Sequence, residues 1–119
     1  MEHISEEKLK AELAGFTGTE NYYKHFTGML FTDGVKFLAD KAGAYWLIDI
    51  VASYQCKLKN IGFQLWTLKV NPDKTATVTA KEDTSTPVLV KQELEYTDFL
   101  LSEVELYCID NVLILPSEY

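Results

Sequence analysis

Three polar side chains lie at helical spacing inside the most apolar stretch of the chain. Tyr45, Asp49 and Ser53 follow one another at every fourth position, so a helix would carry them as one narrow polar line. Asp49 has the strongest potential for acid–base chemistry, because burial among tryptophan and isoleucine side chains raises the pKa of a carboxyl group. The favoured alternative is structural. In it, Asp49 lies on the exposed edge of the helix or accepts hydrogen bonds from Tyr45 and Ser53.

His25 is a second candidate, and it lies in the aromatic segment NYYKHF. A histidine with a cysteine and an aspartate could form a thiol hydrolase site. However, the sequences around Cys56 (SYQCKLK) and Cys108 (LYCIDN) match no nucleophile signature. We expect both cysteines to be reduced and partly buried. His3 and His25 lack the neighbouring ligands of a zinc site. The sequence therefore predicts no catalytic residue, no metal and no cofactor.

Four glutamates in the second half could gather on one surface. They belong to two predicted strands, and they are Glu93, Glu95, Glu103 and Glu105. If those strands pair, the carboxylates crowd an outer face of the sheet, where like charges directly opposite each other destabilise pairing. Either the register keeps them apart or the face is acidic for a cation or a basic partner. A solvated outer face is the favoured alternative.

The charge of the chain is negative and unevenly distributed. The net charge is −7, and residues 82–119 contain nine acidic residues and one lysine. No arginine occurs anywhere in the sequence. Arginine is the preferred residue for bidentate contacts to phosphates and guanine, so direct nucleic-acid binding is not expected. A basic protein is the partner that fits this charge.

The first half of the chain has helical patterns. We expect a short helix over about residues 5–14 and a second helix that Thr32 or Asp33 caps and Gly43 ends. A third helix is predicted over 44–55, with a buried strand as the alternative because of its β-branched and aromatic residues. Residues 22–31 are predicted to be a short strand or an irregular extended segment.

From residue 61 the hydrophobic period changes to two. Strands are predicted over 63–70, 75–81, 88–96, 103–109 and 112–115. Asn71–Lys74 and Asp110–Asn111 have the composition of turns, whereas 97–102 turns the chain between two strands.

These patterns predict an α+β fold with N-terminal helices packed on one face of a four- to five-stranded antiparallel meander. The chain is expected to be one domain, 1–119, with a helical half of about 1–57 and a sheet of about 61–116. The sequence VLIL at 112–115 is expected to leave an apolar sheet edge through which two copies could form a homodimer. The aromatic residues Trp66, Tyr96, Phe99 and Tyr107 are assigned to the core or an edge, and exposure of several would mark a binding surface.

The N-terminus is charged and has no hydrophobic signal region. The longest apolar run, 44–52, is interrupted by Asp49 and is too short to span a bilayer. We therefore expect a soluble, cytoplasmic protein without membrane association.

Four segments together resemble a family of small bacterial proteins of unknown function. They are FTGTENYYKH, TDGVKFLADKAGAYWLIDIVASYQ, ELEYTDF and the ending LPSEY. The resemblance spans nearly the whole chain, and members of the family are associated with cyanobacterial and other bacterial genomes, plasmids and phages. It implies a stand-alone domain and brings no activity, ligand or partner.

Three functional hypotheses follow. The first is a non-enzymatic interaction module, an accessory protein of a mobile element, that uses an acidic sheet face. The second is a small enzyme or small-molecule binder with a pocket between the central helix and the sheet, with Asp49, Tyr45 and His25 at its mouth. The third is an acidic mimic of nucleic acid, which needs carboxylates at phosphate-like spacing.

Overall fold

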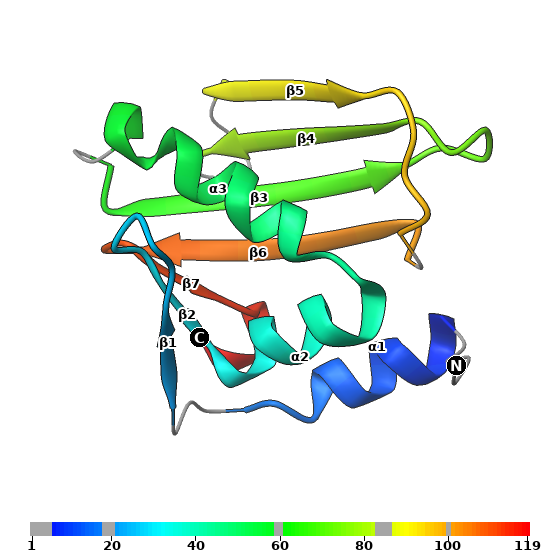
Figure 1. The fold of residues 1–119 in the computed structure, drawn as a ribbon, viewed down its shortest axis with the longest axis horizontal. Coiled ribbons are helices and arrows are strands. Elements are labelled where there is room, and N and C mark those ends of the chain that lie inside the picture. The colour runs from blue at the N-terminus through cyan, green and yellow to red at the C-terminus, as the bar shows by residue number, and fades with distance from the viewer. Residues whose placement is uncertain (1–5, 18–20, 59–60, 83–86, 100) are drawn as a thin grey trace.

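The computed structural model describes residues 6–17, 21–58, 61–82, 87–99 and 101–119. Within these residues the chain has three α-helices and one seven-stranded sheet, which confirms the α+β class (Figure 1). The helices are α1 (Glu6–Ala14), α2 (Asp33–Ala42) and α3 (Tyr45–Leu58). The strands are β1 (Tyr22–Lys24), β2 (Leu30–Thr32), β3 (Phe63–Val70), β4 (Ala76–Lys81), β5 (Val90–Leu94), β6 (Glu103–Ile109) and β7 (Val112–Ile114). A 3-10 turn, η1 (Pro116–Glu118), follows β7. Residue 5, where the first helix was expected to start, lies outside the described residues.

The order of the strands differs from the expected meander. It is β1-β2-β7-β6-β3-β4-β5, and β2 and β7 run parallel while the other neighbours run antiparallel. The predicted four- to five-stranded antiparallel sheet was therefore too small, and the sheet is mixed. β1 and β2 have three residues each, which is too few for a period of two to stand out in the sequence. The sheet thus draws strands from both halves of the chain.

The connection between β5 and β6 is a crossover and not a hairpin turn. β6 pairs with β3, so β3 and β4 lie between β5 and β6. The connection descends along the end of the sheet (Figure 1). It buries Phe99 and Leu101, and the Phe99 ring meets the edge of Trp46 at a centroid distance of 6.1 Å.

β7 is an internal strand. It pairs with β6 on one side and with β2 on the other. The expected apolar edge at 112–115 was therefore wrong, because both sides of this segment are already paired. The edges of the sheet are β1 and β5.

Helix α2 begins and ends where the sequence predicted. Thr32 has an extended backbone, and its hydroxyl accepts a hydrogen bond of 3.4 Å from the Val35 N–H. Gly43 adopts the left-handed conformation with φ 62°, and its N–H donates to the Ala39 carbonyl. The cap residue is thus Thr32, not Asp33.

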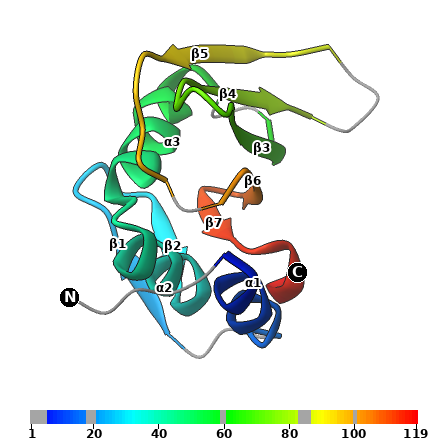
Figure 2. The same cartoon turned by 90° about the vertical axis from the view of Figure 1, so that its right-hand side faces the viewer.

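The stretch 44–55 is helical, as the hydrophobic spacing favoured over the strand alternative. α3 buries Leu47, Ile48, Val51, Ala52 and Leu58, which lie on one side of the helix. Figures 1 and 2 show α3 lying along β3 and its neighbours on one face of the sheet.

The long strands bury one face under the helices. Trp66 and Leu68 of β3 and Val78 of β4 are almost completely buried on that face. Figure 2 shows no helix of the described chain on the other side of β3, β4 and β6. We call this side the uncovered face.

Candidate functional site

The polar line on α3 faces solvent. The Asp49 side chain is 63% exposed, and Tyr45 and Ser53 are also exposed. The Ser53 hydroxyl donates to the Ile50 carbonyl at 2.7 Å, and the Tyr45 hydroxyl donates to Asp40. The alternative of an exposed Asp49 is therefore confirmed, but its expected bonds to Tyr45 and Ser53 are not formed.

The Tyr45–Asp40 hydrogen bond shifts both groups away from reactivity. It holds the pKa of Asp40 below its usual value, and the ammonium of Lys36, 3.0 Å from the carboxylate, acts in the same direction. The same bond raises the pKa of Tyr45. Asp40 thus stays ionised and Tyr45 stays protonated near neutral pH. The hydrogen bond between them therefore has a structural role.

Asp49 and His25 are brought together. Nε2 of His25 lies 2.7 Å from Oδ1 of Asp49, and the His25 side chain is only 8% exposed. His25 belongs to the β1–β2 connection and Asp49 to α3. Both residues were expected at the mouth of one pocket together with Tyr45, whose hydroxyl instead donates to Asp40.

Thr27 extends the pair on its other side. Nδ1 of His25 lies 2.9 Å from the Thr27 hydroxyl oxygen and accepts a hydrogen bond of 3.2 Å from the Thr27 N–H. Because Nδ1 accepts this main-chain bond, Nε2 carries the proton and donates to Asp49. Thr27 was not among the residues predicted from the sequence, where its only signal is a hydroxyl residue two positions after a histidine in HFTG.

Hydrolases use this order of groups, hydroxyl, imidazole and carboxylate, to activate a nucleophile. Two observations argue against that use here. The lone pair of Nδ1 that a general base needs already receives the Thr27 N–H. The carboxylate of Asp49 is 63% exposed, whereas the carboxylate of such a triad is buried against its histidine. The three residues instead hold the β1–β2 connection against α3.

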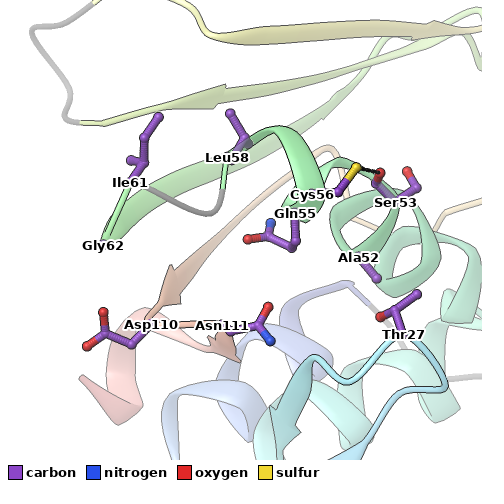
Figure 3. Close-up of a pocket in the computed structure, with 10 residues that line it drawn as sticks. All are labelled: Thr27, Ala52, Ser53, Gln55, Cys56, Leu58, Ile61, Gly62, Asp110 and Asn111. Atoms are coloured by element: carbon purple, nitrogen blue, oxygen red, sulfur yellow. Dashed lines mark hydrogen bonds between the residues drawn. The ribbon is translucent and has the colours of Figure 1, made fainter.

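A cavity of about 580 Å³ opens between α3, the β1–β2 connection and the β6–β7 turn (Figure 3). Thr27, Ser53, Cys56, Asp110 and Asn111 are among the residues that line it. Tyr45, Asp49 and His25 do not, so the expected pocket mouth is not formed by these three residues.

The two cysteines differ in exposure. Cys56 is exposed, contrary to the expectation, and its thiol lies 3.9 Å from the Ser53 carbonyl oxygen. Cys108 is buried, and burial raises the pKa of its thiol to about 12. Both are free thiols. The described residues contain no group of three or more His, Cys, Asp and Glu that could hold a metal ion.

The four glutamates do not form one acidic cluster. Glu93 lies opposite Thr77 on one side of the β3–β4 pair, and Glu103 and Glu105 lie opposite Lys69 and Thr67 on the other side. Glu95 comes directly after β5 and is exposed. Nζ of Lys91 lies 3.9 Å from Oε1 of Glu93. The crowding depended on the pairing of β5 with β6, and these two strands do not pair. The array of carboxylates that a nucleic-acid mimic needs is interrupted by Lys69 and Lys91.

The uncovered face instead carries an aromatic cluster, defined by Phe63, Tyr107 and Tyr119. Their ring centroids are 5.0 Å apart for Phe63–Tyr107, 6.0 Å for Phe63–Tyr119 and 5.5 Å for Tyr107–Tyr119. Tyr119 is 77% exposed, and the other two are partly exposed. Of the four aromatics named from the sequence, Trp66 and Phe99 are buried, while Tyr107 and Tyr96 reach the surface.

The surroundings of the aromatic cluster are apolar on one side and acidic on the other. Leu65 and Ile109 share its face of the sheet, and Ile114 lies opposite Tyr107 on β7. Along β6 the next outward-facing residues are Glu105 and Glu103, which are exposed. The cluster therefore joins an apolar surface to two carboxylates.

The comparison with known proteins assigns a family. A family model described as "Family of unknown function (DUF6876)" matches residues 7–119. The chain belongs to this family. No curated protein and no solved structure matches it. In the part of the chain that the structure describes, every helix is too short or too polar to cross a membrane.

Proposed function

We propose that the protein is a non-enzymatic interaction module that binds a basic protein on its uncovered face. The observation that carries this proposal is the aromatic cluster, which lies on a sheet face that no helix of the described residues covers. Tyrosine and phenylalanine are enriched in protein interfaces because they offer large contact areas at a small cost in side-chain entropy. An aromatic group of this size at the surface is a candidate binding hot spot.

The charge around the aromatic cluster indicates the chemistry of the partner. Glu103 and Glu105 continue the outward-facing line of β6 from Tyr107, and the whole chain has a net charge of −7. A partner with an apolar patch bordered by lysine or arginine would place its cations on these carboxylates. Such complementarity chiefly increases the association rate and selects the partner.

The cellular setting that we propose is the one expected from the sequence. The module would act in the bacterial cytoplasm as an accessory protein of a mobile element. The support for this setting is the resemblance of the sequence segments.

The partner can be identified by site-specific photo-crosslinking. A photoreactive amino acid at Ile109 would label a protein bound to the uncovered face, and the same group at Ser53 on α3 serves as the control. The labelled protein is then purified and its affinity measured by calorimetry at low and moderate salt.

Variants of the module test the contact directly. We expect Tyr107→Ala and Tyr119→Ala to raise Kd about 10- to 100-fold, whereas Phe26→Ala, which removes a 91% exposed aromatic elsewhere, leaves Kd unchanged. Glu105→Lys should raise Kd about tenfold and reduce its salt dependence, whereas Asp98→Lys, an equal change of charge, should not. Equal crosslinking from Ser53, or a Kd insensitive to Tyr107 and Glu105, would contradict the proposal.

A further inference from the structure

Among the described residues, no strand pairs with the outer edge of β5. β5 is the last strand of the sheet and has five residues, whereas the opposite edge strand, β1, has three. The residues that precede β5, Val88 and Leu89, are exposed by 46% and 40%. An edge of this length leaves a row of main-chain N–H and C=O groups ready to pair with another strand.

The register of the neighbouring strands shows which main-chain groups are open. At the β3–β4 turn the Asn71 N–H donates to the Thr75 carbonyl at 2.8 Å. Successive residues of a strand bond to opposite sides, so the odd-numbered residues of β4 bond to β3 and the even-numbered residues bond to β5. Ala76, Val78 and Ala80 are therefore the residues that bond to β5.

Their partners on β5 follow from the same register. Ala76, Val78 and Ala80 lie opposite the even-numbered residues Leu94, Gln92 and Val90. The remaining residues, Lys91 and Glu93, direct their N–H and C=O groups to the open edge. Their side chains lie on the uncovered face and are 62% and 75% exposed.

We propose that the open edge of β5 binds β5 of a second copy of this chain, antiparallel, about a two-fold axis at Gln92. In this arrangement Lys91 of one protomer lies opposite Glu93 of its partner, and each pair exchanges both main-chain hydrogen bonds. The two sheets then become one continuous sheet. The proposal is independent of the function proposed above, because the aromatic cluster lies away from β5 and remains uncovered.

The charges on β5 select this register. With the axis at Gln92, a lysine faces a glutamate on each side of the axis, which stabilises a cross-strand pair. With the axis at Lys91 or at Glu93, two like charges would lie directly opposite each other. An axis between two residues would place an open main-chain group opposite one that already bonds to β4. The isologous pairing at Gln92 is thus the one that satisfies both the main chain and the charges.

Apolar residues at both ends of β5 fit the same pairing. On the helix side Val90 would lie opposite Leu94 of the partner. Leu94 lines a cavity of about 400 Å³ together with Trp46, Ile50 and Tyr96, and Tyr96 is 71% exposed. In the same register, the exposed Val88 and Leu89 of the partner lie beside the residues that follow Leu94. Dimerisation would therefore cover the apolar residues that the monomer leaves in water at this edge.

The test is the oligomeric state of charge variants, measured by sedimentation over a concentration range of about 1 µM to about 1 mM. An edge pairing of this size is expected to give a weak dimer with a micromolar to millimolar Kd. Lys91→Glu and Glu93→Lys each place like charges opposite each other on both sides of the axis, so each should raise Kd about 10- to 100-fold. An equimolar mixture of the two variants, and the doubly exchanged K91E/E93K chain, should regain the affinity of the natural chain.

A third variant, at Lys91, tests the main-chain hydrogen bonds of the proposed pairing instead of its charge pairs. Lys91→Pro removes an N–H that faces the open edge, so it should abolish the dimer and leave the circular dichroism of the monomer unchanged. The proposal is overturned if the natural chain is monomeric at about 1 mM. It is also overturned if the dimer resists all three variants, or if mixing K91E with E93K restores nothing.

Discussion

At the scale of single residues, the Glu118 side chain joins the C-terminal 3-10 turn to the start of α2. Oε1 of Glu118 accepts hydrogen bonds from the Thr32 hydroxyl at 2.6 Å and from the Leu115 N–H at 3.0 Å, and Oε2 accepts one of 3.3 Å from the Gly34 N–H. The carboxylate therefore lies at the positive N-terminal end of α2. A Cβ at Gly34 would lie 2.5 Å from Leu115 Cδ1 and 2.6 Å from Glu118 Oε1, so a larger residue there would displace the Leu115 or the Glu118 side chain.

Replacing Glu118 should destabilise the fold. We expect Glu118→Ala to lower the free energy of unfolding by about 1–2 kcal/mol, because it leaves the N–H of Gly34 and the hydroxyl of Thr32 without their acceptor. Glu118→Gln should give a smaller loss, since one of its amide atoms still accepts. Urea unfolding measures both. Glu103→Ala, at an exposed position, is the control, and a stability for Glu118→Ala equal to that control would show that the contact contributes nothing.

Residue roles could be predicted where the partner is local. Thr32 caps α2 through a residue three positions away, and Gly43 ends the same helix, so both follow from adjacent sequence. Glu118 contacts Thr32 across 86 positions, and no local pattern indicates such a pair. In the sequence, Tyr45 lies four positions before Asp49 and five positions after Asp40, so either carboxylate could accept its hydrogen bond. Because α2 packs beside α3, the Tyr45 hydroxyl donates to Asp40.

At the scale of elements, His25 joins the β1–β2 connection to α3. Its bond to Asp49 is 2.7 Å long, and its bonds to Thr27 close the turn that follows β1. His25 also donates its main-chain N–H to Met29 at 2.7 Å, which directs β2 back along β1. The side chain of one residue thus sets the position of a two-stranded segment on the helix.

A double-mutant cycle should isolate this contact. His25→Ala removes buried packing and the hydrogen bond, Asp49→Ala removes only the exposed acceptor, and the double variant provides the fourth corner. Because Asp49 is largely solvated, we expect a coupling energy of about 0.5–1 kcal/mol from urea unfolding. The same cycle with Ser53→Ala in place of Asp49→Ala should give no coupling. A coupling near zero for His25 and Asp49 would mean that other packing holds the connection on α3.

Elements with strong local signals were predictable, and their arrangement was not. Asp110 and Asn111 have φ values of 48° and 68°, as the two-residue hairpin turn requires, and β6 and β7 flank them as expected. β5 and β6 were also found, but their partners depend on contacts between distant segments. The crossover between them follows from the pairing of β6 with β3. It could not be predicted, because the segment 97–102 has the composition of a turn.

At the scale of the whole molecule, β7 connects the two halves of the chain. It lies between β6, from the second half, and β2, from the first half, and Leu113 at its centre is fully buried. η1 then contacts the first half of the chain, because the Ser117 hydroxyl donates a hydrogen bond of 3.2 Å to the Leu13 carbonyl. The helices and the long strands therefore share one core through the last residues of the chain.

This connectivity predicts a single cooperative unfolding transition. Trp66 is buried in the sheet and Trp46 lies on α3, so tryptophan fluorescence reports on both layers, while far-UV circular dichroism reports on the backbone. The two signals should give the same midpoint in urea, as in a two-state domain. A chain that ends at Asn111 lacks β7 and Glu118, and it should lose both signals together, whereas removal of Tyr119 alone should leave one transition with a similar midpoint. Two separate midpoints, or a chain ending at Asn111 that keeps a folded sheet, would show that the halves are stable independently and that β7 does not unite them.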